Sequence, residues 1–165
     1  MVRTDLQRRV FFFHWLVVIL VAVVIAPTAL SQGKPPFAGK WRANLSKSKR
    51  DPNHLFKSLT LRFEISEDVV SVTYAGVNMS GSEESGTTKL YPDGKEHPIA
   101  EAPGIVQVSR WVGPRLLESV GKKDGKVVGQ STYEISSDGN TLTATIKGID
   151  GSGSTFEQVI VFDRE

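Results

Sequence analysis

The sequence predicts an all-β protein whose strands follow one another as a single antiparallel, up-and-down meander. The clearest evidence is in its last third, because residues 116–162 alternate β-rich runs with short turns. These turns hold Asp-Gly pairs at Asp124, Asp138 and Asp150, and Gly readily takes the positive φ that tight hairpin turns need. A second observation is that residues 37–165 lack the 3.6-residue apolar repeat of an amphipathic helix.

The N-terminal stretch differs from the rest of the chain. Three Arg side chains within residues 1–9 precede an apolar run over residues 10–26. Ala29 and Ser31 then place small residues at the −3 and −1 positions of a cleavage site before Gln32. This pattern is typical of a secretory signal peptide. The alternative is an uncleaved apolar anchor helix, since the run is only slightly shorter than the ~20 residues of a spanning helix.

These features predict a signal peptide at residues 1–31, a linker at 32–36 and a β-barrel domain at 37–165, exported to the periplasm or outside the cell. The pair Arg8-Arg9 ahead of the apolar run also resembles the core of a twin-arginine export signal. The chain has no Cys, which excludes a disulfide, a thiol nucleophile and a lipid-modified N-terminal Cys. A Cys-free exported domain favours a bacterial envelope.

The net charge excludes one class of partner. Of the 20 basic and 18 acidic side chains, three and one, respectively, lie in residues 1–31, which leaves 17 of each. The predicted domain is therefore formally neutral. It lacks the basic footprint of a nucleic-acid-binding protein and has no basic amphipathic helix for a membrane surface.

The first strands can be placed in chain order. Residues 37–44 predict a strand, and the charged stretch 45–54 predicts a loop with a solvated basic face, because Pro52 opposes a long helix. In residues 58–65 apolar side chains alternate with polar ones, as in a half-buried strand. After a turn, a returning strand is predicted at 69–76, followed by a polar loop or weak strand at 77–86 and a short strand at 87–91. A turn at 92–95 and a loop or bent edge strand at 96–104 then lead to a further strand at 105–111.

The final meander adds four strands, predicted at residues 116–120, 127–135, 141–149 and 155–162. A flat meander of about eight to ten strands would expose two edges, and closure into a barrel removes them. The interior of such a barrel is either filled by side chains or holds one small ligand.

Gly39-x-Trp41 resembles the opening of lipocalin-like (calycin) barrels, in which Gly-x-Trp begins the first strand. The longer pattern Gly39-x-Trp41-x-x-Asn44-x-x-x-Ser48 is similar to that of a group of short exported bacterial proteins to which no activity is attached. The resemblance implies that Trp41 packs at the closed end of the barrel beneath a basic side chain. Arg164, after the last strand, is the first candidate for that side chain, and Arg115 is the second.

No catalytic or metal-binding constellation is visible. His54 and His97 each lie in a predicted loop without a neighbouring His, so both are expected to be surface residues. The Asp-Gly turns lack the residue spacing of a Ca²⁺ loop. Glu83 and Glu84 are adjacent and point to opposite sides of an extended chain. The prediction is a protein that is not an enzyme and has no metal or cofactor.

Five aromatic side chains are candidates for ligand contact inside the barrel: Phe63, Tyr74, Trp111, Tyr133 and Phe156. The alternative is that they simply form its core. Because neighbouring strand residues face opposite sides, the pair Arg110-Trp111 favours Trp111 in the core and Arg110 outward. An inward Arg110 would need an anionic partner such as a ligand carboxylate.

The leading hypothesis is an exported, non-enzymatic lipocalin-like barrel that binds a small apolar molecule. The alternative is a structural or protein-interaction domain of the cell envelope with a filled barrel, tethered through residues 10–26 if these are not removed. A third hypothesis, an enzyme on a barrel scaffold, lacks clustered acids and bases to support it.

Overall fold

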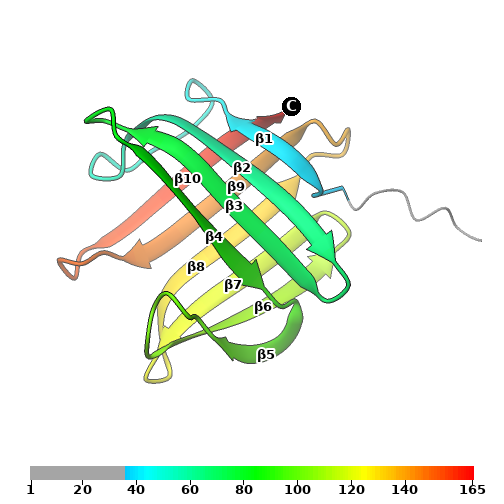
Figure 1. Cartoon of the computed structure of the whole chain (residues 1–165), viewed down its shortest axis with the longest axis vertical. Coiled ribbons are helices and arrows are strands. Elements are labelled where there is room, and N and C mark those ends of the chain that lie inside the picture. The colour runs from blue at the N-terminus through cyan, green and yellow to red at the C-terminus, as the bar shows by residue number, and fades with distance from the viewer. Residues whose placement is uncertain (1–35) are drawn as a thin grey trace, which may run out of the picture. The chain divides into compact units, whose positions relative to one another are not determined.

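The computed structural model describes residues 36–165 and contains ten β-strands in that range (Figure 1). These are β1 (Gly39–Ala43), β2 (Phe56–Ser66), β3 (Val69–Asn78), β4 (Glu83–Leu90), β5 (Asp93–Pro98), β6 (Ile105–Gly113), β7 (Leu116–Lys123), β8 (Lys126–Ile135), β9 (Thr141–Ile149) and β10 (Thr155–Arg164). The all-β prediction is therefore confirmed for this part of the chain. The predicted signal peptide at 1–31 and most of the linker at 32–36 lie outside the described residues. Within 36–165 there is no helix of the length and apolarity needed to cross a membrane.

All ten strands belong to one antiparallel sheet with the order β4-β3-β2-β1-β10-β9-β8-β7-β6-β5. Sheet neighbours are also chain neighbours except for β1 and β10, where Trp41 pairs with Arg164 and Ala43 with Phe162. The sheet curls until β2, β3 and β4 lie across from the second half of the meander, with β4 approaching β6 (Figure 1). This arrangement confirms the predicted up-and-down order.

The predicted closure of the barrel needs a correction, because the sheet begins at β4 and ends at β5 with no ladder joining these two described strands. β5 is a short, polar strand whose pairing with β6 is irregular between Asp93 and Glu96. Gly94 there takes a positive φ of 74°, and Pro98 lacks a backbone donor. A bulge and a proline are common devices that prevent further pairing at a sheet edge. The result is a curled sheet that is open on one side.

The three Asp-Gly turns of the last third join β7 to β8, β8 to β9 and β9 to β10, as the sequence predicts. Asp124 and Gly125 both take positive φ, 51° and 75°, which is the conformation of a tight hairpin turn whose twist matches the flanking strands. In the third turn the positive φ of 84° belongs to Gly153. The Asp150 carboxylate stabilises this longer turn by accepting backbone N–H bonds from Ser152 and Ser154, at 2.9 and 3.0 Å.

Two strands begin in segments that the sequence does not clearly predict as strands. β4 begins at Glu83, inside the segment 77–86 predicted as a polar loop or weak strand, and β5 begins at Asp93, where the sequence predicts a turn. Neither segment has the apolar alternation that marks a strand. Both are strands because a neighbour supplies the ladder, as where His97 pairs with Gln107 on β6. His97 therefore lies in a strand and not in a loop.

The buried apolar side chains gather at one end of the curled sheet, which we call the closed end. The chain enters β1 and leaves β10 there, and the turns that join β2 to β3, β6 to β7 and β8 to β9 lie at this end. The largest fully buried apolar side chains are Trp41, Phe37, Phe63, Phe162, Leu117, Ile135, Leu142, Ile160 and Val70. We call the opposite end, which carries the connections β1–β2, β3–β4, β7–β8 and β9–β10, the open end.

Candidate functional site

The Gly-x-Trp pattern has a structural explanation at the closed end. Trp41 is fully buried, its Nε1 donates to the Phe37 carbonyl at 3.0 Å, and the guanidinium carbon of Arg164 lies 4.0 Å from its ring centroid. Gly39 has a φ of 131°, and a Cβ at this position would lie 3.2 Å from Nη1 of Arg164. Arg164 therefore occupies the position that the resemblance implies for the basic side chain, whereas Arg115 is exposed.

Arg164 also joins three chain segments. Its Nε donates to the Gly139 carbonyl at 2.8 Å and its Nη1 to the Ala38 carbonyl at 3.1 Å, while Nη2 donates to the carbonyl of Pro36. The side chain thus holds the β8–β9 turn and the segment before β1 over the indole of Trp41. A cation over an indole face contributes ~0.5–2 kcal/mol, so this end is stabilised by more than apolar burial.

Three of the five candidate ligand residues belong to the closed end. Phe63 is buried, and its ring meets that of Tyr133 edge-on with 5.4 Å between centroids. Phe37 lies between Phe63 and Trp111, and its ring centroid is 5.7 Å from that of Phe63 and 5.1 Å from the Trp111 ring. Trp111 is 39% exposed at the rim, so the expectation of Trp111 in the core is only partly met. Arg110 points outward, as favoured, and its Nη2 lies 2.8 Å from Glu118.

The inner face of β6 to β10 changes character from the closed end to the open end. Three rows of register partners cross these five strands. The first row, nearest the closed end, is Trp111, Leu117, Tyr133, Ala144 and Ile160. The second row is Ser109, Ser119, Ser131, Ile146 and Gln158. The third row is Gln107, Gly121, Gly129, Gly148 and Phe156. Large apolar side chains thus give way to serines and glycines.

The polar groups of the second row are mostly satisfied. Ser109 and Ser119 are buried and share a hydrogen bond of 3.0 Å. Burial raises the pKa of the Tyr133 phenol, and a hydrogen bond with Ser131 only partly offsets this. Oε1 of Gln158 is buried and has no hydrogen-bond partner within residues 36–165. A buried acceptor without a partner costs about 1–3 kcal/mol, so this atom is an exception that calls for an explanation.

The other two aromatic candidates lie nearer the open end, each flat against a glycine. A Cβ at Gly148 would lie 2.9 Å from the Phe156 ring, and a Cβ at Gly86 would lie 2.7 Å from the Tyr74 ring. Gly148 and Phe156 are register partners on β9 and β10, and Gly86 and Tyr74 are partners on β4 and β3. Tyr74 remains 41% exposed. The five candidates are therefore divided between the two ends and do not form one cluster.

Residues 44–55, between β1 and β2, form a strap that follows β10 toward the open end. Asn44 N donates to the Val161 carbonyl at 2.7 Å. Further along, Lys49 exchanges two backbone hydrogen bonds with Val159, at 2.8 and 2.7 Å. The predicted loop 45–54 is thus bound to the sheet, and one of its basic side chains, Arg50, donates to the Phe56 carbonyl at 3.0 Å.

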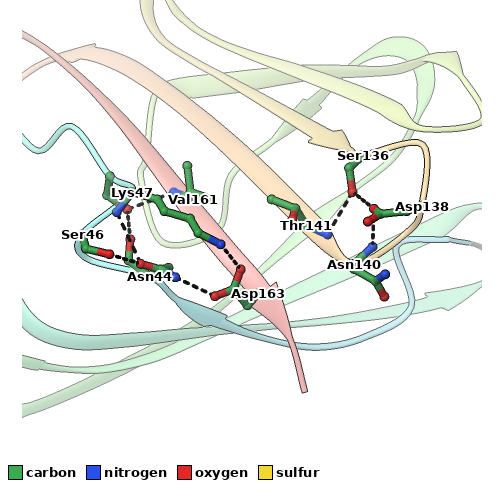
Figure 2. Close-up of polar contacts among 10 residues, drawn as sticks. Asn44, Ser46, Lys47, Ser136, Asp138, Asn140, Thr141, Val161 and Asp163 are labelled. Atoms are coloured by element: carbon green, nitrogen blue, oxygen red, sulfur yellow. Dashed lines mark hydrogen bonds and ion pairs between the residues drawn. The ribbon is translucent and has the colours of Figure 1, made fainter.

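Asn44 and Ser48, the polar members of the Gly-x-Trp pattern, hold the start of this strap. Figure 2 shows the contacts of Asn44 with Ser46 and Asp163. Asn44 Oδ1 accepts from the hydroxyl of Ser46 at 2.7 Å, and its Nδ2 donates to Asp163 at 2.7 Å. Ser48 Oγ donates to the Asn44 carbonyl at 2.7 Å and accepts from Val161 N at 3.0 Å. These bonds give both motif residues a structural role.

His54, at the end of the strap, is not the ordinary surface residue that the sequence predicts. Its ring stacks on Phe156 with 4.3 Å between centroids, and its Nδ1 lies 3.1 Å from Asp51. The hydrogen bond from His54 is the main cause that lowers the pKa of Asp51. Because the strap folds back over β10, His54 is half-buried and covers Phe156.

Two pockets at the open end are lined by candidate ligand residues. One of about 190 Å³ lies between the strap and strands β2 to β4, with His54, Phe56, Tyr74, Asn78 and Glu84 in its lining. Another of about 550 Å³ lies along the ends of β8, β9 and β10, where Gly129, Gly148 and Phe156 line it. Tyr74 and Phe156, the two candidates that lie away from the core, thus line separate pockets.

The described residues contain no group of three or more His, Cys, Asp or Glu side chains placed to hold a metal ion. His97 stacks on Tyr91 at 4.4 Å and lies 3.0 Å from Asp93. Glu83 pairs with Val77 at the start of β4, and Glu84 accepts from Asn78 Nδ2 at 2.6 Å. These groups make local polar contacts that explain their positions.

Gln158 is the site residue that the sequence analysis missed. A signal was present, because Phe156, Gln158, Ile160 and Phe162 alternate along one face of β10, and a Gln in such a series faces inward. The serines of the second row carry no such signal, since their strands are identified by other residues.

Comparison with known proteins shows the fold. No protein-family model matches this chain, and neither does any curated protein sequence. Among solved structures, the wild-type fluorescent protein UnaG has a TM-score of 0.52 and 21% identity, over 78% of this chain and 97% of UnaG. A UnaG variant also has a TM-score of 0.52, with 22% identity over 79% of this chain and 96% of its own. Zebrafish ileal bile acid-binding protein complexed with cholic acid is more distant, with a TM-score of 0.46 and 16% identity over 79% of this chain and 99% of its own.

The curled antiparallel sheet and these likenesses define a lipocalin-like (calycin) fold, which confirms the resemblance drawn from Gly39 and Trp41.

Proposed function

We propose that this protein is a non-enzymatic carrier that holds a small, largely apolar molecule in the open half of its curled sheet. One observation carries the proposal: the change from large side chains in the first row to Ser and Gly in the second and third rows. Even a closed eight-stranded barrel is just wide enough for side chains to fill. The ten strands of this sheet curl without a ladder between β4 and β5, so the small Ser and Gly side chains of the second and third rows leave room that a ligand would occupy. In this proposal the approach of β4 to β6 covers the side between β4 and β5.

The surroundings of that space favour an apolar ligand. Ile146 and Leu59 are partly buried apolar side chains that pack against the core, and Tyr74 and Phe156 offer ring faces nearer the open end. Ligand pockets are mostly apolar with a few placed polar groups, and in this proposal the second row supplies the polar groups while Ile146, Leu59 and the two rings supply the apolar surface.

Export belongs to the same proposal. The basic, apolar and small-residue segments of residues 1–31 have the pattern of a signal peptide. We therefore place the carrier in the periplasm or outside the cell. If the segment is not removed, residues 10–26 would anchor it to the membrane.

A second function is favoured by a separate observation at the closed end. Pro36, Phe37, Ile65, Trp111 and Pro114 line a shallow apolar depression there, and the neighbouring Val112 is half exposed. Exposed apolar patches often mark interaction sites. This surface supports the alternative of a structural or protein-interaction domain with a filled interior.

Native mass spectrometry of the protein purified from its own host, before and after denaturation, tests the carrier function. The carrier predicts an adduct of small-molecule mass that is lost on unfolding and is soluble in organic solvent. Repeated recovery of the bare chain, together with failure to bind added apolar compounds, would contradict the carrier and favour the filled domain.

A further inference from the structure

The buried oxygen of Gln158 is the feature that a purely apolar ligand does not explain. Gln158 faces the interior because it alternates with Ile160 and Phe162, both of which are buried. Its Oε1 is buried and without a hydrogen-bond partner within residues 36–165. Buried side-chain acceptors almost always have a partner in native proteins, so a group other than the described side chains is expected to donate to this oxygen.

None of the neighbouring polar side chains donates to that oxygen in the structure. Along the second row, the Ser109 hydroxyl donates to that of Ser119 at 3.0 Å, and neither Ser119 nor Ser131 donates to Oε1 of Gln158. Ile146, the register partner of Gln158 on β9, has no polar atom in its side chain. The acceptor therefore faces the interior beside an apolar neighbour, at the border between the packed core and the row of glycines.

This position restricts the chemistry of what binds there. A hydroxyl or N–H group satisfies the oxygen, whereas an ether or ester oxygen does not, because both would be acceptors. A fully charged ligand head is disfavoured, because no charged side chain belongs to the three rows and a buried charge needs a partner. The polar group must therefore be neutral and attached to an apolar body.

From this geometry we infer that Gln158 is the polar anchor of the ligand site and selects apolar molecules that carry a neutral hydrogen-bond donor, such as an alcohol. The inference rests on the proposed carrier function and makes it more specific. The ligand's donor bonds to Oε1 of Gln158, and its apolar body lies toward Phe156 and Tyr74 at the open end.

The test compares two matched ligands on protein produced from the full-length sequence. Decan-1-ol carries a donor, and its methyl ether lacks one. Their dissociation constants are measured by displacement of a fluorescent apolar dye from the wild type, Gln158→Met and Gln130→Met. Gln130 is an exposed Gln on β8 that lies outside the three rows and beside the pocket lined by Phe156, so the last variant controls for a Gln→Met change near that pocket.

We expect the ratio of the two dissociation constants, ether over alcohol, to fall about tenfold from the wild type to Gln158→Met, the effect of one hydrogen bond. Gln130→Met should keep the wild-type ratio. Gln158→Met should not melt earlier than the wild type, because it removes a buried polar group without reducing side-chain volume much.

Two results would overturn the inference, and only the second would also contradict the carrier function. If both ligands bind and Gln158→Met leaves their ratio unchanged, Gln158 is not the anchor, but the carrier function stands. If neither ligand displaces the dye from the wild type, or no dye binds, both the anchor and the carrier function fail.

Discussion

The two ends of the curled sheet are built from the same ten strands but follow different rules. At the closed end, Trp41, Phe63 and Leu117 are buried in one apolar core, and Arg164 covers it with a network of carbonyl bonds. Toward the open end the same strands present Ser, Gly and Gln inward. Under the proposed function, the closed end supplies the stability of the fold and the open end holds the ligand.

The difference also explains how one meander can serve both purposes. A core of large side chains can stabilise the sheet from one end, because strands pass continuously through both regions. Small inner residues at the open end then cost little stability, and the strap of residues 44–55 covers that end from outside the meander. The predictions below test this division from the largest expected effect to the smallest.

The largest effect is expected for Trp41→Ala. The substitution empties a fully buried indole site and should destabilise the protein by about 3–5 kcal/mol. At roughly 2–4 °C per kcal/mol for a chain of this size, a thermal melt should show a loss of about 6–20 °C.

The matched control for Trp41→Ala is Tyr74→Ala at the open end. Tyr74 is 41% exposed and touches Gly86, so its removal should cost about 1 kcal/mol or less. Equal losses for the two aromatic side chains would break the proposed division.

A smaller effect is expected for Arg164→Met. The change keeps part of the apolar stem but removes the charge over Trp41 and the bonds to three carbonyls. We expect a loss of about 2 kcal/mol, which combines a cation–π contact with net hydrogen bonds. Urea denaturation measures this loss, and an unchanged midpoint would show that Arg164 adds nothing to the stability of the closed end.

The contacts between the strap and Asp163 make the stability of the fold depend on pH. The hydrogen bond from Asn44, followed by that from Lys47, lowers the pKa of Asp163 below its ordinary value of 3.8. A carboxyl whose pKa is lower in the folded state stabilises the fold above its unfolded pKa, and this contribution is lost as the pH falls through the folded pKa.

We therefore expect wild-type stability to fall more steeply than that of Asp163→Asn as the pH drops below about 4, measured as urea midpoints at several pH values. The other carboxyls of lowered pKa are present in both proteins, so the difference between the two curves isolates Asp163. Parallel curves would contradict the assigned role.

The sequence predicts the strands and turns of the last third because their apolar residues alternate and each turn has Asp-Gly. β4 and β5 were located less well, because Glu83 to Gly86 and Asp93 to Pro98 have no apolar side to bury. They become strands only through ladders with β3 and β6, which are tertiary contacts that local composition does not contain.

The site was harder to predict than the fold for a related reason. Aromatic residues are the usual candidates for ligand contact, yet Phe63 and Tyr133 belong to the packed cluster. What distinguishes the open half is the smallness of Gly129 and Ser131, and their alignment in rows depends on strand register. Register requires the paired strands and cannot be read from one run of residues.

The central claim is that the interior is filled at the closed end and has space at the open end. Two substitutions that each replace a small inner side chain by a larger one test this claim most directly. Ala144→Leu adds volume in the first row, where Ala144 is fully buried. Gly129→Leu adds volume in the third row, where a Cβ would meet nothing closer than 3.8 Å.

Thermal melts of the two variants distinguish an open end with space from an interior that is filled throughout. Binding of the fluorescent dye is measured in parallel. We predict that Ala144→Leu destabilises the protein by about 1–3 kcal/mol through overpacking. We predict that Gly129→Leu melts no earlier than the wild type, since Gly in a strand is itself unfavourable, and binds the dye more weakly. Equal destabilisation by both variants, with dye binding unchanged in Gly129→Leu, would show that the interior is filled from end to end.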